Sequence, residues 1–256
     1  MSNKVIAVLR DKRYCPKGIQ VDADILEAVA ERIKVDTFIN EAQLTPNHLT
    51  TNTTLVLSMG RLPETIAMLK TSQANGAIVV NAPSAVEICT HRTRLHQVMQ
   101  ACGVALPPEQ GARSWWLKRG DADAHESCDV VFCENDARLL EAQNAFRQRG
   151  ITEWVVSPHV EGTGVKFYGV GHHFFRCYTD DGKPVGAGAL GLDLDALHKE
   201  VLKIVDAVKI DVYGGDCIVD PGGRFYIIDF NDWPSFRYCK DEASLAIVNS
   251  LMHYEL

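Results

Sequence analysis

The sequence predicts an α/β fold, in the broad sense that includes α+β domains, and three observations lead to it. Up to about residue 80, short apolar runs alternate with amphipathic segments, the pattern of a parallel sheet that helices cover. From Gly164 onward strands dominate the pattern, and Gly222-Gly223 separates two apolar runs as a hairpin turn does. The length of 256 residues provides for one large domain or for two to three smaller ones.

The N-terminal unit is predicted to hold four strands and two helices. The strands are expected over 5–9, 35–39, 54–57 and 77–80, and the helices over 22–33 and 63–70. Ile25, Leu26 and Val29 recur at helical spacing, and Pro63 stands in the first turn of the second helix. The turn residues of 81–84 then end the unit, so a domain boundary is predicted after residue 82.

Two further domains are predicted, over 83–158 and 159–256. The first has helices over 85–88, 93–101 and 136–149 and strands over 115–118, 130–132 and 154–157. The second has strands over 165–170, 174–178, 216–219 and 225–230 and helices over 194–208 and 243–252.

Charge and composition exclude several classes of protein. A net charge of −7 argues against binding nucleic acid through a basic face. No apolar run approaches the roughly 18 residues that span a bilayer, and the short apolar run near the N-terminus predicts no signal peptide. The eight cysteines form no Cys-x-x-Cys pair, which is typical of reduced thiols. A cytoplasmic protein without a nucleic-acid or membrane partner is therefore expected.

The densest chemical signal lies in the predicted C-terminal hairpin. Asp216 is expected at the start of one strand and Asp229 at the end of its partner. Asn231 shares the face of Asp229 because strand side chains alternate. Two carboxylates and an amide oxygen favour Mg²⁺, or Mn²⁺ in its place. The alternative is that these residues only end strands and begin turns, but three of them on one hairpin favour a metal site.

This arrangement resembles the ATP-grasp enzymes, in which an acid on one strand, a hairpin and an acid-x-Asn element are followed shortly by Pro. Asp216, Asp229, Asn231 and Pro234 match that pattern. The resemblance covers about residues 80–240, and the N-terminal unit is similar to the family's Rossmann-like pre-ATP-grasp domain. It implies the ATP-grasp fold, in which two α+β subdomains sandwich the nucleotide. The likeness is to glutathione synthetase-like carboxylate–amine ligases and, less strongly, to inositol-phosphate kinases of that fold.

The resemblance also implies a set of nucleotide-binding residues. Lys118 stands where the family has a strand lysine that reaches the phosphates, and Lys166 where a basic residue of the next strand faces the triphosphate. Arg94, with Arg92 nearby, replaces the family's usual lysine at a helix start. The segment 155–162 resembles the interdomain hinge that holds the adenine. Its candidate ATP-binding residues are Ser157, His159, Val160 and Glu161.

The sequence signals for residues that bind the acceptor are less specific than those for ATP. Arg176 lies among aromatic residues, where it either binds an acidic group or forms a structural ion pair. Asp232, Ser235 and Arg237 follow the metal motif and are expected to line the acceptor pocket. Lys166, Arg176 and Arg237 are the candidate catalytic residues. His125 lies in an acidic loop, where it either reaches a phosphate or the acceptor, or is simply solvated.

The leading interpretation is an ATP- and Mg²⁺-dependent ligase that forms a carbon–nitrogen bond through an acyl-phosphate, releasing ADP and phosphate. A small-molecule kinase of the same fold is the alternative, since only the acceptor differs. The acidic loop and the net charge of −7 argue against a polyphosphorylated acceptor. A catalytically inactive nucleotide-binding module is the third interpretation, although all three metal-ligand candidates are present. The expected partners are ATP and a small-molecule acceptor, and the family implies a homodimer.

Overall fold

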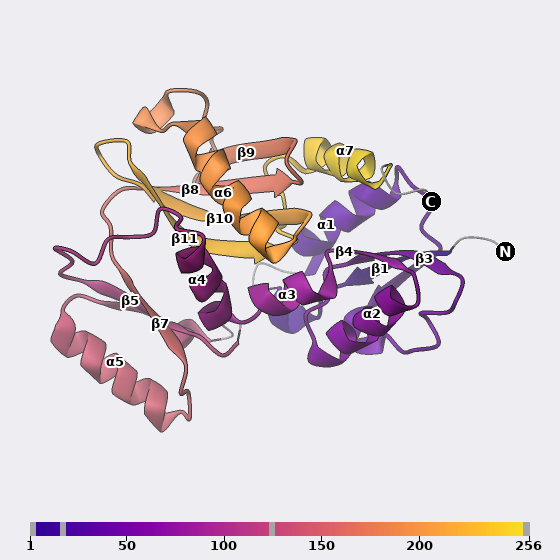
Figure 1. Cartoon of the computed structure of the whole chain (residues 1–256), viewed down its shortest axis with the longest axis horizontal. Coiled ribbons are helices and arrows are strands. Elements are labelled where there is room, and N and C mark those ends of the chain that lie inside the picture. Colours follow the sequence, from indigo (N-terminus) through magenta and orange to yellow (C-terminus); the bar gives the residue numbers. More distant parts are fainter. Residues whose placement is uncertain (1–3, 16–18, 123–125, 253–256) are drawn as a thin grey trace.

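Residues 4–15, 19–122 and 126–252 are described by the computed structural model, which arranges them around three sheets (Figure 1). The first sheet is parallel, with strand order β2-β1-β3-β4. The other two, ordered β6-β5-β7 and β11-β10-β8-β9, are antiparallel. No helix in the described part of the chain is long and apolar enough to cross a membrane.

The parallel sheet is covered by one helix on each face. Its strands are β1 (Lys4–Leu9), β2 (Thr37–Asn40), β3 (Thr53–Ser58) and β4 (Ile78–Val80), and its helices are α1 (Ile19–Ala30) and α2 (Pro63–Ala74). Leu55 and Leu57 share a core with Leu26 of α1. Val56, on the opposite face of the same strand, shares another with Leu69 of α2. This alternation along β3 confirms the prediction of a helix-covered parallel sheet.

The three-stranded sheet is packed against α5. It consists of β5 (Trp115–Arg119), β6 (Val130–Cys133) and β7 (Trp154–Pro158), and α5 covers Asp136–Gln148. Leu117 and Cys133 of the sheet are fully buried against Phe146 of the helix. The helix begins where the Asn135 side chain accepts a hydrogen bond from the Arg138 amide and ends before Gly150, which has a φ of 76°.

The four-stranded sheet contributes to the largest apolar cluster among the described residues. Its strands are β8 (Thr163–Val170), β9 (Phe174–Thr179), β10 (Val212–Val219) and β11 (Phe225–Asp232), and α6 (Leu194–Val208) covers one face. Leu197, Val201 and Ile204 of α6 pack against Phe167, Cys217 and Ile227 of the sheet. The short helices α3 (Pro83–Cys89) and α4 (Arg92–Ala101) contribute Ala85, Leu95 and Met99 to the same core.

The C-terminal helix α7 (Lys240–Leu251) returns to the N-terminal unit and lies beside α1 (Figure 1). Ala243, Ile247 and Leu251 share a core with Ile25 and Val29. Helices α1 and α7 therefore pack together, and the parallel sheet is joined to the four-stranded sheet through one continuous apolar cluster. The domain boundaries after residues 82 and 158 remain predictions.

Every strand and helix predicted from the sequence is present, but β10 begins four residues earlier than predicted. Asp216 therefore lies in the middle of its strand, and the expectation of a strand start is wrong. Gly214 and Gly215 are strand residues in close contact with their neighbours. A Cβ on Gly215 would lie 2.3 Å from the carbonyl oxygen of Asp229, so the hairpin strands require glycine there.

Candidate active site

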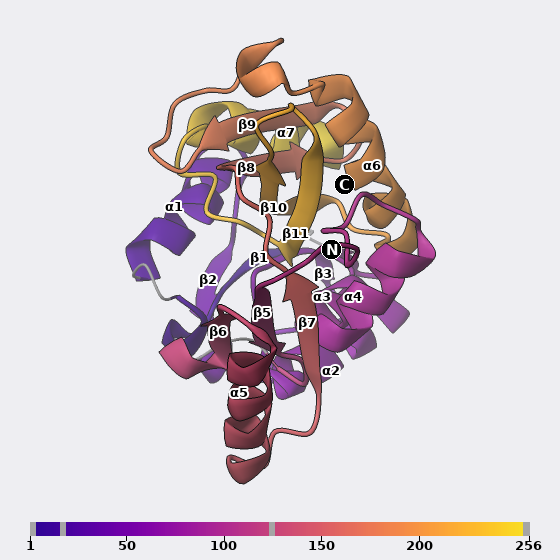
Figure 2. The same cartoon turned by 90° about the vertical axis from the view of Figure 1, so that its left-hand side faces the viewer.

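The three-stranded sheet faces the hairpin of β10 and β11 (Figure 2). Side chains of both line a cleft. The cleft consists of two adjoining pockets that share Lys118, Ser157 and Ile228. The larger, of about 240 Å³, is mainly apolar. Its lining is Trp116, Lys118, Val130, Ser157, Pro158, His159, Val160, Ile218 and Ile228. The narrower pocket extends toward α4 and reaches Asp229, and Arg92, His96 and Pro107 are among its other lining residues.

Trp116 and His159, which line the larger pocket, both pack against the Phe132 ring. The Trp116 indole N–H donates to His159 Nδ1 at 3.1 Å, and His159 Nε2 lies 3.1 Å from Glu161 Oε1. Because an indole N–H only donates, Nδ1 is the acceptor nitrogen, and the imidazole proton is on Nε2. The Phe132 ring is 5.1 Å from each of the other two rings and 46 % exposed. This wall suits a planar aromatic base.

Three of the four hinge candidates line the larger pocket. Ser157, His159 and Val160 line the larger pocket, whereas the Glu161 side chain is 91 % exposed and contacts His159. Trp116 is half-buried and also lines the pocket. It is on the face of β5 that carries Lys118, and this face points into the cleft.

Lys118 reaches across the cleft. Its Nζ donates a hydrogen bond to the Ile228 carbonyl oxygen at 2.9 Å, which joins β5 to β11. Burial lowers the pKa of the Lys118 ammonium, the Arg92 charge adds to this, and the attraction of Asp229 opposes it. A buried ammonium in this position can replace its hydrogen bond to a neutral carbonyl oxygen with a stronger one to an anionic oxygen.

Lys166, Asp216 and Asp229 lie on three adjacent strands at the same level. In the strand register Asp216 is opposite Lys166 on one side and Asp229 on the other. Lys166 Nζ is 2.6 Å from Asp216 Oδ1 and 3.4 Å from Asp180 Oδ1. Asn231 Nδ2 donates to Asp229 Oδ2 at 3.1 Å, so the amide and the second carboxylate are in contact.

The electrostatics of this group fit a divalent cation. Burial raises the pKa of Asp216, the charge of Asp229 raises it further, and Lys166 opposes both. Burial also lowers the pKa of Lys166, but its contacts with Asp216 and Asp180 outweigh this and leave the pKa raised. A cation held between the two carboxylates would relieve their repulsion. Since no three His, Cys, Asp or Glu side chains cluster among the described residues, the oxygen of Asn231 is needed as a third ligand.

A separate polar pocket of about 230 Å³ adjoins the metal-site residues. Its described lining is Arg10, Tyr14, Asp22, Arg61, Lys166, Tyr168, Gly215, Asp216, Asn231, Asp232, Trp233, Pro234 and Ser235. Lys166, Asp216 and Asn231 thus face this pocket, whereas Asp229 lines the narrower pocket of the cleft. The candidate metal ligands therefore stand between an apolar cleft and a polar pocket.

Comparison with solved structures identifies the fold. Over 99 % of this chain and 98 % of the other, the structure is similar to D-alanyl-alanine synthetase A from Vibrio cholerae, with a TM-score of 0.71 and 11 % identity. It is also similar to VanG D-Ala:D-Ser ligase from Enterococcus faecalis, with a TM-score of 0.69, 14 % identity and coverage of 100 % of both chains. A RimK domain ATP-grasp protein from Sphaerobacter thermophilus gives a TM-score of 0.67 and 15 % identity over 95 % of this chain and 98 % of that chain. The chain has the ATP-grasp fold.

The sequence itself gives no such match. Neither a protein-family model nor a curated protein sequence matches the chain. The ATP-grasp fold is therefore recognised from the tertiary structure.

Arg92, and not Arg94, is the arginine of α4 that lines the cleft. Arg92 shares a face of α4 with Leu95, His96 and Met99, which all line the cleft. Arg94 follows by two residues, about 200° around the helix, and lines a different pocket beside Arg61 and Lys70. The role of Arg94 as an ATP-binding residue stays a prediction, and its position outside the cleft does not favour it.

We expect Arg92→Gln to weaken ADP binding about tenfold, because a cation beside the phosphates is lost. Arg94→Gln, the matched control on the opposite face of the same helix, should leave the dissociation constant within about twofold. Isothermal titration calorimetry with both variants measures the difference. A larger effect of Arg94→Gln would contradict the placement of α4.

Two of the predicted catalytic residues, Arg176 and Arg237, are not among the described residues that line the polar pocket. Arg176 forms an ion pair of 2.8 Å with Glu242 of α7, and its guanidinium lies 4.9 Å from the Phe174 ring centre. Arg237 stacks on the Tyr238 ring at 4.4 Å and contacts its hydroxyl. Both side chains are surface contacts, so the structural interpretation of Arg176 applies. Of the remaining candidates, Ser235 lines the pocket and His125 lies outside the described residues.

Proposed function

We propose that the protein is an ATP-dependent ligase that activates a small carboxylic acid as an acyl-phosphate and joins it to an amine. The observation that carries this proposal is the position of Asp216, Asp229 and Asn231 between an apolar cleft and a separate polar pocket. Such an arrangement keeps a nucleotide and an acceptor apart except at the phosphate that passes between them. The solved structures of similar fold named as ligases support it.

The side chains of the cleft divide the binding of ATP between them. Trp116, His159 and Val160 contact the base, and Lys118 and Arg92 contact the phosphates. Mg²⁺, or Mn²⁺ in its place, would be held by Asp216, Asp229 and Asn231 and would supply neutralisation of phosphate charge. Lys166 faces the polar pocket and provides a second cation on the acceptor side of the transferred phosphate.

The proposed reaction has two steps. A carboxylate oxygen of the acid attacks the γ-phosphorus of ATP, the bond from that phosphorus to the bridging oxygen breaks, and ADP leaves. The amine nitrogen then attacks the acyl carbon, phosphate leaves, and the nitrogen loses a proton. Lys166 stabilises the negative charge that develops on the phosphoryl oxygens.

The charges of the polar pocket favour this ligase over a kinase for polyphosphorylated sugars. Three cations, Arg10, Arg61 and Lys166, stand among the described lining residues with three carboxylates, Asp22, Asp216 and Asp232. A pocket for several phosphates requires an excess of cations, whereas this balance suits an acceptor with at most one negative group.

Phosphorus NMR of the protein with Mg-ATP and pooled small acids and amines tests the proposal. We expect ADP and free phosphate to form only when both an acid and an amine are present. A new phosphoester resonance without free phosphate would instead establish a kinase. No turnover with any pool, although ADP binds in calorimetry, would indicate a nucleotide-binding module and contradict the ligase.

A further inference from the structure

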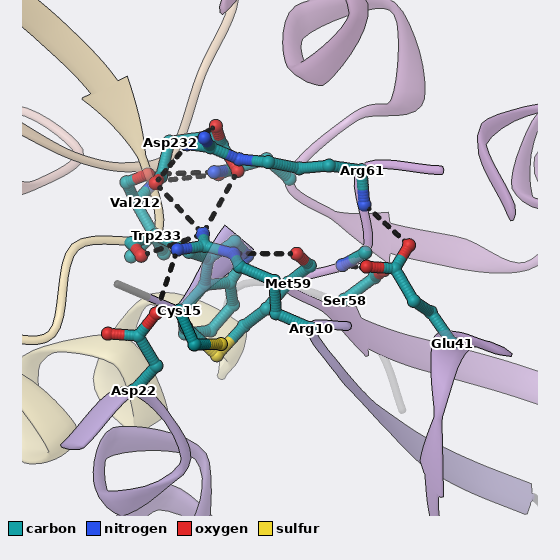
Figure 3. Close-up of polar contacts among 12 residues, drawn as sticks. Arg10, Cys15, Asp22, Glu41, Ser58, Met59, Arg61, Val212, Asp232 and Trp233 are labelled. Carbon is teal, nitrogen blue, oxygen red and sulfur yellow. Dashed lines mark hydrogen bonds and ion pairs between the residues drawn. The ribbon is translucent and has the colours of Figure 1, made fainter. Parts of the chain in front are cut away.

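All four strands of the parallel sheet are followed by a polar side chain at the same edge. Arg10 follows β1, Glu41 follows β2, Arg61 comes shortly after β3, and Asn81 follows β4. The carboxyl ends of parallel strands lie together, so these four residues lie along one edge of the sheet. Arg10, Arg61 and Asn81 contact the open end of the β10–β11 hairpin, which contributes Asp232 (Figure 3).

The end of β11 is held by two buried arginines. The Asp232 side chain is fully buried and lies 2.5 Å from Arg61 Nη2 and 3.6 Å from Arg10 Nη2. Arg10 Nη2 also donates to the Trp233 carbonyl oxygen at 3.1 Å, as Figure 3 shows. Arg10 and Arg61 are only 7 % and 9 % exposed, so water screens these contacts weakly.

Glu41 fixes the two loops that carry these arginines. One carboxylate oxygen accepts a hydrogen bond from the Asp11 amide, and the other accepts one each from the Arg61 and Leu62 amides, all at 2.7 Å. Glu41 is 2 % exposed. A carboxylate that accepts three backbone hydrogen bonds holds both loops at a set distance from each other.

Asn81 holds the beginning of β10 in a similar way. Its Nδ2 donates to the Val212 carbonyl oxygen, and its Oδ1 accepts from the Val212 amide, both at 2.7 Å. The Trp233 amide donates to the same carbonyl at 3.1 Å, and the Trp233 indole N–H donates to Val80. Both strands of the hairpin are thereby anchored at their open end, four residues from Asp216 on β10 and one from Asn231 on β11.

We propose that this edge of the parallel sheet positions the metal-binding hairpin, with Arg61 and Asp232 as positioning residues. The inference rests on the proposed function, since it concerns the metal site of that ligase. Arg10 directs its Nε, Nη1 and Nη2 groups to Met59, Asp22 and Trp233, so its hydrogen bonds serve the protein's own backbone and side chains. Asp232, expected to bind the acceptor, lines the polar pocket, but its side chain is fully buried and its ion pairs hold the hairpin. A ligand site loosened by even about 1 Å loses much of its function.

The test is the double variant Arg61→Met/Asp232→Asn, which removes both charges without leaving either one unpaired in the interior. Mn²⁺ binding in the presence of ADP is followed by electron paramagnetic resonance of the free ion. We expect Mn²⁺ to bind at least about tenfold more weakly, while the affinity for ADP in EDTA is unchanged. The matched control is Lys70→Met/Glu87→Gln, which removes an exposed ion pair of 2.8 Å and should change neither affinity.

Each outcome separates a positioning role from a merely stabilising one. A folded double variant that melts at a lower temperature but binds Mn²⁺ like the wild type would overturn the proposal. If the double variant does not fold, Arg61→Lys decides, because lysine keeps the charge but lacks the planar guanidinium whose Nη2 contacts both the carboxylate and the carbonyl oxygen of Asp232. We expect it to weaken Mn²⁺ binding at least about threefold, and an unchanged affinity would overturn the proposal. Wild-type protein that binds ADP but no Mn²⁺ would instead show that the metal site of the proposed function is itself wrong.

Discussion

Replacing Asp229 with Asn should lower kcat/KM for the proposed ligation by about 10³-fold, because one of two charged metal ligands becomes neutral. Asp229 lines the cleft, lies opposite Asp216 in the hairpin and accepts a hydrogen bond from Asn231. The substitution keeps the shape of the side chain, so the fold should be retained. Turnover as a function of Mg²⁺ concentration measures the effect.

The control for this variant is Asp195→Asn, which changes an exposed acid in the first turn of α6. It removes the same charge from the protein at a site away from the cleft and should keep wild-type turnover. Circular dichroism of both variants verifies that the fold is intact. Wild-type turnover of Asp229→Asn would show that the metal site has been assigned to the wrong residues.

Lys118→Met should weaken binding of ADP by about 10- to 100-fold. The ammonium contacts Ile228 across the cleft. Among the described residues, Lys118 is the only strand lysine that lines both pockets of the cleft. Methionine preserves the length of the side chain and its packing but removes the charge. Calorimetric titration with ADP measures the change, and unchanged affinity would show that the phosphates lie elsewhere.

The pH dependence of binding provides a second measurement for Lys118. Burial lowers the pKa of this ammonium below its ordinary value of 10.5, so it loses its charge at a lower pH than exposed lysines do. The wild type should therefore lose affinity for ADP as the pH rises toward 10.5, whereas Lys118→Met should stay level. Lys203→Met, which removes an exposed lysine paired with Glu200, should retain both the affinity and the pH dependence of the wild type.

Much of the fold was predictable because its signals are local. The alternation of strands and helices up to β4 and the Gly222-Gly223 hairpin follow from periodicity and turn chemistry over a few residues each. The strand ends were less predictable, as β10 shows, because Gly214 and Gly215 are tolerated in a strand only through their close neighbours. Contacts of that kind are not visible in the local sequence.

The site was predictable only in part. Asp216, Asp229 and Asn231 lie close together because one hairpin carries all three, and Ser157 and His159 are only two residues apart in the chain. Arg92 could not be chosen over Arg94, since the sequence shows that α4 has two sides but not which of them faces the cleft.

The sequence by itself determined the order of the elements, the hairpin with its oxygen ligands and the strand lysines, because these depend on residues near one another in the chain. Only the tertiary structure decided which residues support them. Arg61 meets Asp232 across 171 positions, and Arg176 meets Glu242 across 66. The first contact joins the parallel sheet to the metal-site hairpin, and the second turns a candidate catalytic residue into a surface ion pair. Such pairings arise from the packing of whole sheets, which no local pattern encodes.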